Sequence, residues 1–202
     1  MDPAVSLSAF FTVFLAIFIA ELTDKDALLL LTLATKSNPW LVFLAGSVAF
    51  TLTSAVIVTV GSALVLVVPV SWIKAAGGVI MLGYAAWTFT RGGVGSSEGE
   101  EKKLLGQRRG ELSWLALAIL SLMLLDLAGD ATELLTVVFV AQFKDLLLVF
   151  GGAVAALILA SGLETILGNR LGRVLTASTL RLVSVFVFFV IGASILLSVA
   201  TG

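Results

Sequence analysis

Six acidic side chains lie inside two of the most apolar stretches of this chain. Three of them, Glu21, Asp24 and Asp26, are near the middle of residues 7–35. The other three are near the middle of residues 112–141: Asp126, Asp130 and Glu133. A carboxylate at the centre of a bilayer costs at least about 2.5–3.5 kcal/mol on insertion scales, so such residues usually bind cations, exchange protons or face water. The pattern therefore predicts a functional site.

Helical spacing indicates which of these residues can act together. Glu21 and Asp24 are three positions apart, so they share one helix face, and Lys25, four positions from Glu21, can partly neutralise it. Asp26 follows Asp24 by two positions, which places it on the opposite side of a continuous helix. Either the helix unwinds at Thr23-Asp24, or Asp26 faces another surface.

The second acidic cluster has the same organisation. Asp126 and Asp130 are four positions apart and share a helix face, whereas Thr132 lies across the helix from Asp130. Gly129-Asp130 is the corresponding break point. Interrupted helices offer carbonyl groups and helix ends to an ion at the middle of a membrane.

Composition restricts the available chemistry. The chain has 202 residues, of which 59% are hydrophobic and 12% are charged, and its mean hydropathy is +1.15, values far from those of soluble domains. It contains no cysteine and no histidine, which excludes disulfides, thiolate zinc sites and haem ligation. The near-zero net charge argues against nucleic-acid binding. The remaining hard oxygen ligands favour Ca²⁺, Mn²⁺ or Mg²⁺.

The elements that position the acids are predicted to be six membrane-spanning helices. Polar, proline and glycine residues divide the chain into apolar stretches long enough to cross a bilayer. These stretches are residues 7–35, 40–68, 72–90, 112–141, 146–167 and 182–200. We therefore expect an all-α integral membrane protein with a first three-helix unit (1–90), a charged cytoplasmic linker (91–111) and a second three-helix unit (112–202).

The two units align with each other. A shift of 106 residues places Asp24 on Asp130 and Gly46 on Gly152, and a shift of 107 places Ser54 on Ser161. After three crossings a chain restarts from the opposite side, so the second unit must be inverted relative to the first. The repeat then brings both acidic motifs together at mid-membrane.

Basic residues orient the helices. Eleven of the twelve Lys and Arg residues lie outside the spans, because Lys25 is within one. Nine lie in the first, third and fifth loops: Lys36, Arg91, Lys102, Lys103, Arg108, Arg109, Arg170, Arg173 and Arg181. Only Lys74 and Lys144 lie on the other side, so the positive-inside rule predicts that both termini are extracytoplasmic.

The motifs resemble those of the Gdt-type cation transporters of the LysE superfamily, whose signature Glu-x-Gly-Asp-(Lys/Arg)-(Thr/Ser) occurs in the first and fourth helices. Residues 21–26, Glu-Leu-Thr-Asp-Lys-Asp, resemble the first copy. In the second copy Gly129, Asp130 and Thr132 match, but Leu127 stands where the glutamate belongs. Asp126 and Glu133 are candidates to replace that charge.

The resemblance implies an exporter of Mn²⁺ or Ca²⁺ in exchange for protons in a prokaryotic cell membrane. We predict that Glu21, Asp24, Asp126 and Asp130 bind the ion, with secondary roles for Lys25, Asp26, Thr132 and Glu133. The partners are then the cation substrate, protons and membrane lipid. No resident cofactor is expected, and whether copies form a homo-oligomer is left open.

Other functions make different demands on the residues. An exporter of amino acids or other small organic cations, as elsewhere in the LysE superfamily, needs an anion-binding group and a larger pocket. A membrane transferase needs a nucleophile and base, a retinal protein needs a Schiff-base lysine, and a purely structural protein has no use for intramembrane acids. The chain is therefore not expected to be an enzyme.

Two further sets of residues have alternative interpretations. Thr51, Thr53, Ser54 and Ser161 either line the path as hydroxyl ligands or donate hydrogen bonds back to their own helices, which is the commoner role. Glu164 is interpreted as an ion-pair partner of Arg170 or Arg173 rather than as a ligand.

Overall fold

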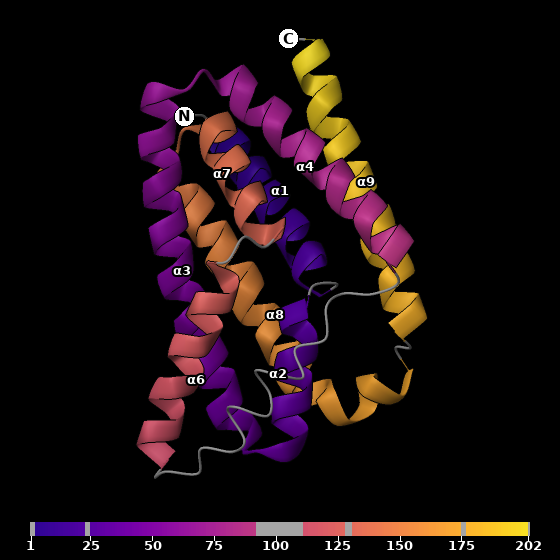
Figure 1. Cartoon of the computed structure of the whole chain (residues 1–202). Coiled ribbons are helices and arrows are strands. Elements are labelled where there is room, and N and C mark those ends of the chain that lie inside the picture. The colour runs from indigo at the N-terminus through magenta and orange to yellow at the C-terminus, as the bar shows by residue number, and fades with distance from the viewer. Residues whose placement is uncertain (1–2, 23–24, 92–110, 128–130, 175–176, 202) are drawn as a thin grey trace.

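The structure is a computed structural model of the chain, and it describes residues 3–22, 25–91, 111–127, 131–174 and 177–201. All the regular structure in these ranges is helical (Figure 1). The helices are α1 (Pro3–Glu21), α2 (Lys25–Lys36), α3 (Pro39–Val67), α4 (Val70–Arg91), α6 (Glu111–Asp126), α7 (Ala131–Phe143), α8 (Leu146–Val174) and α9 (Ala177–Ala200). The expected all-α architecture is confirmed.

Local sequence signals explain where the second and fifth predicted spans begin. Asn38 caps α3 by accepting a hydrogen bond from the Trp40 N–H at 3.1 Å, and Pro39 occupies the first turn, where no backbone donor is needed. Asp145 acts similarly before α8, because its Oδ1 accepts from the Leu148 N–H at 3.1 Å. Both helices therefore begin at short polar turns.

The helices correspond to the predicted spans, with one difference at the fifth loop. The first span is divided into α1 and α2 and the fourth into α6 and α7, whereas the others are single helices. Residues 168–181 were expected to be mostly loop, but α8 continues to Val174 and α9 begins at Ala177. Hydropathy marks only the apolar part of a helix, and a helix continues into polar surroundings wherever its backbone bonds are kept.

The two long, continuous helices α3 and α8 pack against each other, and the interrupted spans pack against them. Both α1 and α2 pack against α8, while both α6 and α7 pack against α3. Fully buried apolar side chains fill these contacts, including Ile17, Leu29, Phe50, Leu122 and Leu135. Each predicted unit thus places its interrupted helix pair against the long helix of the other unit.

The remaining pair, α4 and α9, makes an intimate helix-helix contact beside the others (Figure 1). A Cβ atom added to Gly78 would lie 2.7 Å from Leu196 Cγ and 3.1 Å from the Gly192 carbonyl oxygen. A Cβ on Gly192 would in turn lie 3.0 Å from the Gly78 carbonyl oxygen. The two backbones touch here because neither residue has a side chain.

The outer surface is strongly apolar. Within the described residues, Pro39–Val67 and Leu146–Ile166 are long and apolar enough to cross a membrane. Large hydrophobic side chains are exposed on several helices, among them Leu66, Trp72, Leu147 and Phe186. Apolar exposure on this scale is unlike the surface of a soluble monomer and fits contact with lipid.

Candidate functional site

Both acidic motifs coincide with helix interruptions. The first interrupted span has Glu21 as the last residue of α1 and Lys25 as the first of α2, and the second has Asp126 as the last residue of α6 and Ala131 as the first of α7. Each motif therefore lies where one helix ends and the next begins. The predicted break points themselves, Thr23-Asp24 and Gly129-Asp130, lie outside the described residues, so unwinding there stays a prediction.

A small polar cavity lies at the second interruption. Asp126 of α6 lines it together with Thr132, Glu133 and Thr136 of α7. Thr53, Ser54 and Ile57 of α3 and Leu157 of α8 complete the described lining. The volume open to the centres of water-sized spheres is about 10 Å³, which is room for about one such sphere. The cavity is therefore of the size of a single dehydrated ion or water.

The two acids of this cavity approach it from different helix ends. Asp126 is the last residue of α6, where carbonyl groups make the helix terminus electronegative, while Glu133 lies in the first turn of α7. Their side chains are 3% and 8% exposed. The electronegative end of α6 and the electropositive start of α7 offset each other, so the two carboxylates are what favours a cation over an anion here.

Hydroxyl groups supply most of the other polar lining. Thr53 Oγ1 donates a hydrogen bond to the Ala49 carbonyl oxygen at 3.0 Å, and Thr136 Oγ1 donates to the Thr132 carbonyl oxygen at 2.8 Å. The expected back-bonding is therefore confirmed for Thr53, which also lines the cavity, while its alternative role as a hydroxyl ligand stays a prediction. These two interpretations are compatible, because a hydroxyl that donates its proton keeps its acceptor lone pairs.

Part of the first motif, which spans residues 21–26, lies outside the described residues. Glu21 is 1% exposed and is not among the described residues that line the cavity. Lys25 and Asp26 lie in the first turn of α2, but their side chains are outside the described part of the structure. The predicted meeting of Glu21 and Asp24 with Asp126 and Asp130 therefore stays a prediction. Among the described residues, no group of three or more acidic side chains is arranged to hold a metal.

Glu164 is another buried acid. It is 4% exposed on α8, the helix against which α1 and α2 pack. Its predicted pairing with Arg170 or Arg173 stays untested, because the side chains of both arginines lie outside the described residues. The buried Ser161 and Thr165 lie on the same helix, where Ser161 Oγ donates to the Leu157 carbonyl oxygen at 2.8 Å.

Sequence reasoning did not single out Thr136. The signal that could have found it is helical spacing, because Thr136 follows Thr132 by one turn and so extends the polar face of α7. The Thr136 side chain is 4% exposed, and Thr132 one turn before it is also buried, which is the structural counterpart of that signal.

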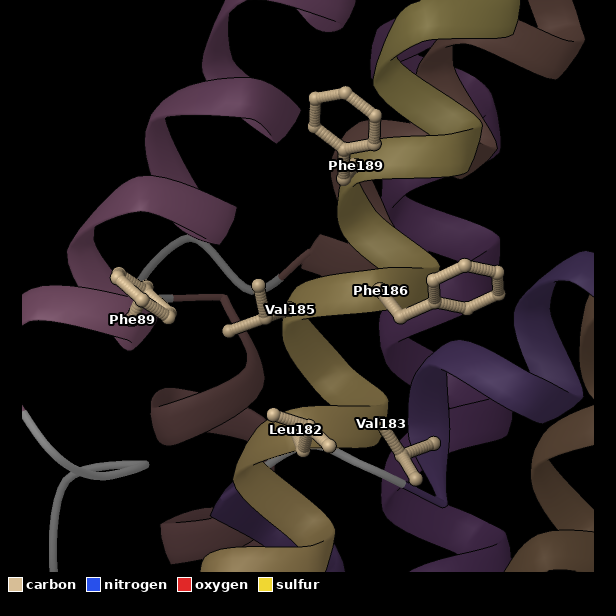
Figure 2. Close-up of a pocket in the computed structure, with 6 residues that line it drawn as sticks. All are labelled: Phe89, Leu182, Val183, Val185, Phe186 and Phe189. Atoms are coloured by element: carbon tan, nitrogen blue, oxygen red, sulfur yellow. The ribbon is translucent and has the colours of Figure 1, made fainter.

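A larger hollow elsewhere on the protein has a different character. It has a volume of about 480 Å³ and is lined by hydrocarbon side chains of α4 and α9. Figure 2 shows Phe89 on α4 across from Leu182 and Val185 on α9. The described residues of its lining include no polar side chain, so they offer nothing to bind a cation.

Apolar helices, two interruptions and buried acids at each interruption are features of secondary transporters in membranes. This assignment as a secondary transporter agrees with a comparison with protein families. The family model of the divalent cation/proton antiporter GDT1 matches residues 9–95 and 115–202. The chain therefore belongs to this family of integral membrane transporters, which are not enzymes. The resemblance inferred from the motifs is confirmed. Comparisons with curated proteins and with solved structures found no match.

Proposed function

We propose that this antiporter exports Mn²⁺ or Ca²⁺ from the cytoplasm while protons enter through the same carboxylates. The observation that carries the proposal is the cavity at the α6–α7 interruption, where Asp126 and Glu133 border a space for a single small occupant. Glu21, Asp24 and Asp130 complete the proposed ion path. Lys25, Asp26 and Thr132 adjust its charge and shape.

The donor set supports this choice of cation. Every polar side chain in the described lining of the cavity ends in oxygen. Hard oxygen donors suit Ca²⁺, Mn²⁺ and Mg²⁺, whereas sites selective for Zn²⁺ or Cu²⁺ usually contain histidine or cysteine, which this chain lacks.

Proton coupling follows from the charge of the site. With a divalent cation bound, the carboxylates are ionised and their charge is compensated. Once the cation leaves toward the outside, an empty cluster of anions in a low-dielectric medium is costly, so at least one acid takes up a proton before the site turns inward. Release of that proton to the cytoplasm then prepares the site for the next cation.

The proposed architecture is six spans in two inverted three-helix repeats. The exchange of packing partners supports it, because α1 and α2 lie on α8 while α6 and α7 lie on α3. The family match also falls into two segments on either side of the linker. The distribution of basic residues supports extracytoplasmic termini and a cytoplasmic linker. The proposed location is a prokaryotic cell membrane, with lipid around the apolar outer surface.

The alternative substrate class, amino acids or other organic cations, gains no support from the site. The space open to the centre of a water-sized sphere is only about 10 Å³, too little for an organic substrate in the described conformation. The cavity is also bordered by two acids, whereas an amino-acid site needs a partner for the substrate carboxylate.

Purified protein in proteoliposomes tests the proposal. Vesicles carrying a pH gradient are given Mn²⁺, Ca²⁺, Mg²⁺ or lysine, and cation flux and lumenal pH are recorded together. We expect Mn²⁺ or Ca²⁺ flux with counterflow of protons. Transport of lysine without divalent cations, or divalent flux that leaves lumenal pH unchanged, contradicts the proposed function.

A further inference from the structure

We propose that Thr53 and Thr136 are specificity-determining residues, whose hydroxyl oxygens directly coordinate the transported cation in the α6–α7 cavity. The inference rests on the proposed function and extends it from charge to ligand identity. It starts from the position of the two residues, since Thr53 lines the cavity from α3 and Thr136 lines it from α7. Their side chains are 1% and 4% exposed.

The hydrogen bonds of these hydroxyls fix their polarity. Thr53 gives its proton to the Ala49 carbonyl oxygen, and Thr136 gives its proton to the Thr132 carbonyl oxygen. A threonine hydroxyl has one donor hydrogen and two acceptor lone pairs, so each oxygen keeps only acceptor capacity for the cavity. These acceptor oxygens cannot donate a hydrogen bond to an anion, whereas they can coordinate a cation.

The size of the cavity explains why hydroxyl oxygens are needed. The space open to the centre of a water-sized sphere is about 10 Å³, too little for a cation with its full hydration shell, so side-chain oxygens must replace the lost waters. The described lining provides six oxygen-bearing side chains: Asp126, Glu133, Thr53, Ser54, Thr132 and Thr136. Only two of these carry charge, and neutral oxygens must supply the other ligands.

This arrangement predicts a preference among divalent cations. Ca²⁺ accepts six to eight oxygen ligands in flexible geometry, whereas Mg²⁺ gives up its waters reluctantly and demands near-ideal octahedral geometry. A tight cavity bounded by hydroxyls on separate helices therefore discriminates against Mg²⁺. Loss of one hydroxyl removes a ligand from the dehydrated cation and weakens that discrimination.

The chain offers a matched control in Thr165. Its side chain is 4% exposed on α8, and its hydroxyl donates to the Ser161 carbonyl oxygen at 2.7 Å. Burial and back-bonding thus equal those of Thr136, but Thr165 does not line the cavity. Valine has nearly the shape of threonine without its hydroxyl, so Thr165→Val reports the cost of losing a buried, back-bonded hydroxyl alone.

The experiment compares the wild type, Thr53→Val, Thr136→Val and Thr165→Val in proteoliposomes. Initial flux is measured over a range of concentrations of the preferred cation, Mn²⁺ or Ca²⁺, and again with Mg²⁺ as competitor. We expect Thr53→Val and Thr136→Val each to raise the KM by about ten-fold, which corresponds to about 1.4 kcal/mol, and to increase inhibition by Mg²⁺. Thr165→Val should retain the wild-type KM, and Thr53→Ser and Thr136→Ser should restore it.

A second readout separates ligand loss from misfolding. Cation-dependent thermal stabilisation of each purified variant in detergent reports binding without transport, since a ligand that binds only the folded state raises its stability. We expect the stabilisation by Mn²⁺ or Ca²⁺ to shrink in both cavity variants and to persist in Thr165→Val. Cavity variants with the wild-type KM, Mg²⁺ inhibition and stabilisation overturn the hydroxyl-ligand inference alone. A wild type that carries no divalent cation overturns the proposed function itself.

Discussion

Glu21 and Asp126 occupy equivalent places in the two interrupted spans. Glu21 is the last residue of α1, Asp126 is the last residue of α6, and both side chains are buried. Alignment of the repeats places Leu127 opposite Glu21, yet the Leu127 side chain is 38% exposed. The acid one residue earlier therefore lies where a carboxylate can reach the cavity.

This relationship predicts the outcome of moving the acid. In the double variant Asp126→Leu/Leu127→Glu the sequence matches the second motif better, but the new carboxylate points toward the exposed side. We expect this variant to lose at least about ten-fold in divalent flux, while Asp126→Glu keeps most of it, because an uncompensated change at a buried charge costs several kcal/mol. Flux assays in proteoliposomes measure both. Wild-type flux in the double variant would show that Asp126 does not replace the missing glutamate.

The contact between α4 and α9 predicts a stability difference between two glycines of the same helix. Gly78→Ala introduces a Cβ against Leu196 and the Gly192 backbone, whereas Gly83→Ala introduces one with nothing within 4 Å. Overpacking of a close contact costs about 1–3 kcal/mol, so Gly78→Ala should lower the melting temperature in detergent. Gly83→Ala should leave it unchanged or raise it slightly, since alanine favours a helix. Equal melting temperatures for the two variants would contradict the close packing of α4 on α9.

The distribution of basic residues predicts the orientation of the chain. After Gly202, only a reporter that functions outside the cytoplasm should be active. Within residues 92–110, only a reporter that functions in the cytoplasm should be active. At each position, one reporter that works only in the cytoplasm and one that works only outside it are compared, which identifies the side of the membrane. Cytoplasmic activity after Gly202 refutes the six-span topology.

Lys25 is predicted to tune the site without coordinating the cation. Lys25→Ala removes a positive charge four residues from Glu21, so it should change the KM or the pH optimum of transport and leave the maximal rate within about a few-fold of the wild type. Lys25→Arg, which keeps the charge, is the control. Complete loss of flux in Lys25→Ala, with normal flux in Lys25→Arg, assigns Lys25 an essential role instead.

Much of the fold was predictable because membrane helices leave strong signals. Long apolar stretches predicted the helices, and the acidic motifs lie where α1 gives way to α2 and α6 to α7, as one of the two interpretations of their spacing requires. The unexpected length of α8 shows the limit of this reasoning. Hydropathy indicates where contact with lipid is tolerated, whereas continuation of the helix beyond that region depends on helix propensity and packing.

The cavity was predictable only in part. Asp126 and Glu133 were expected near the site because buried charge is costly, and Thr132 because it belongs to the second motif. Thr136 was not, because a threonine on an apolar helix carries no charge and satisfies itself by bonding to its own backbone. Its role depends on which face of α7 meets α3, and tertiary packing decides that.

Proton-coupled flux through carboxylate variants tests the central claim most directly. Asp24→Asn, Asp130→Asn and Asp126→Asn each keep the side-chain shape and remove its charge, and each is reconstituted beside the wild type with Mn²⁺ or Ca²⁺ and a pH sensor in the lumen. In the wild type, export should speed up as the pH of the receiving side falls, until protons outcompete the cation. Each variant should lose both cation flux and proton counterflow. Wild-type rates with the same pH dependence in Asp24→Asn and Asp130→Asn would contradict exchange through these carboxylates.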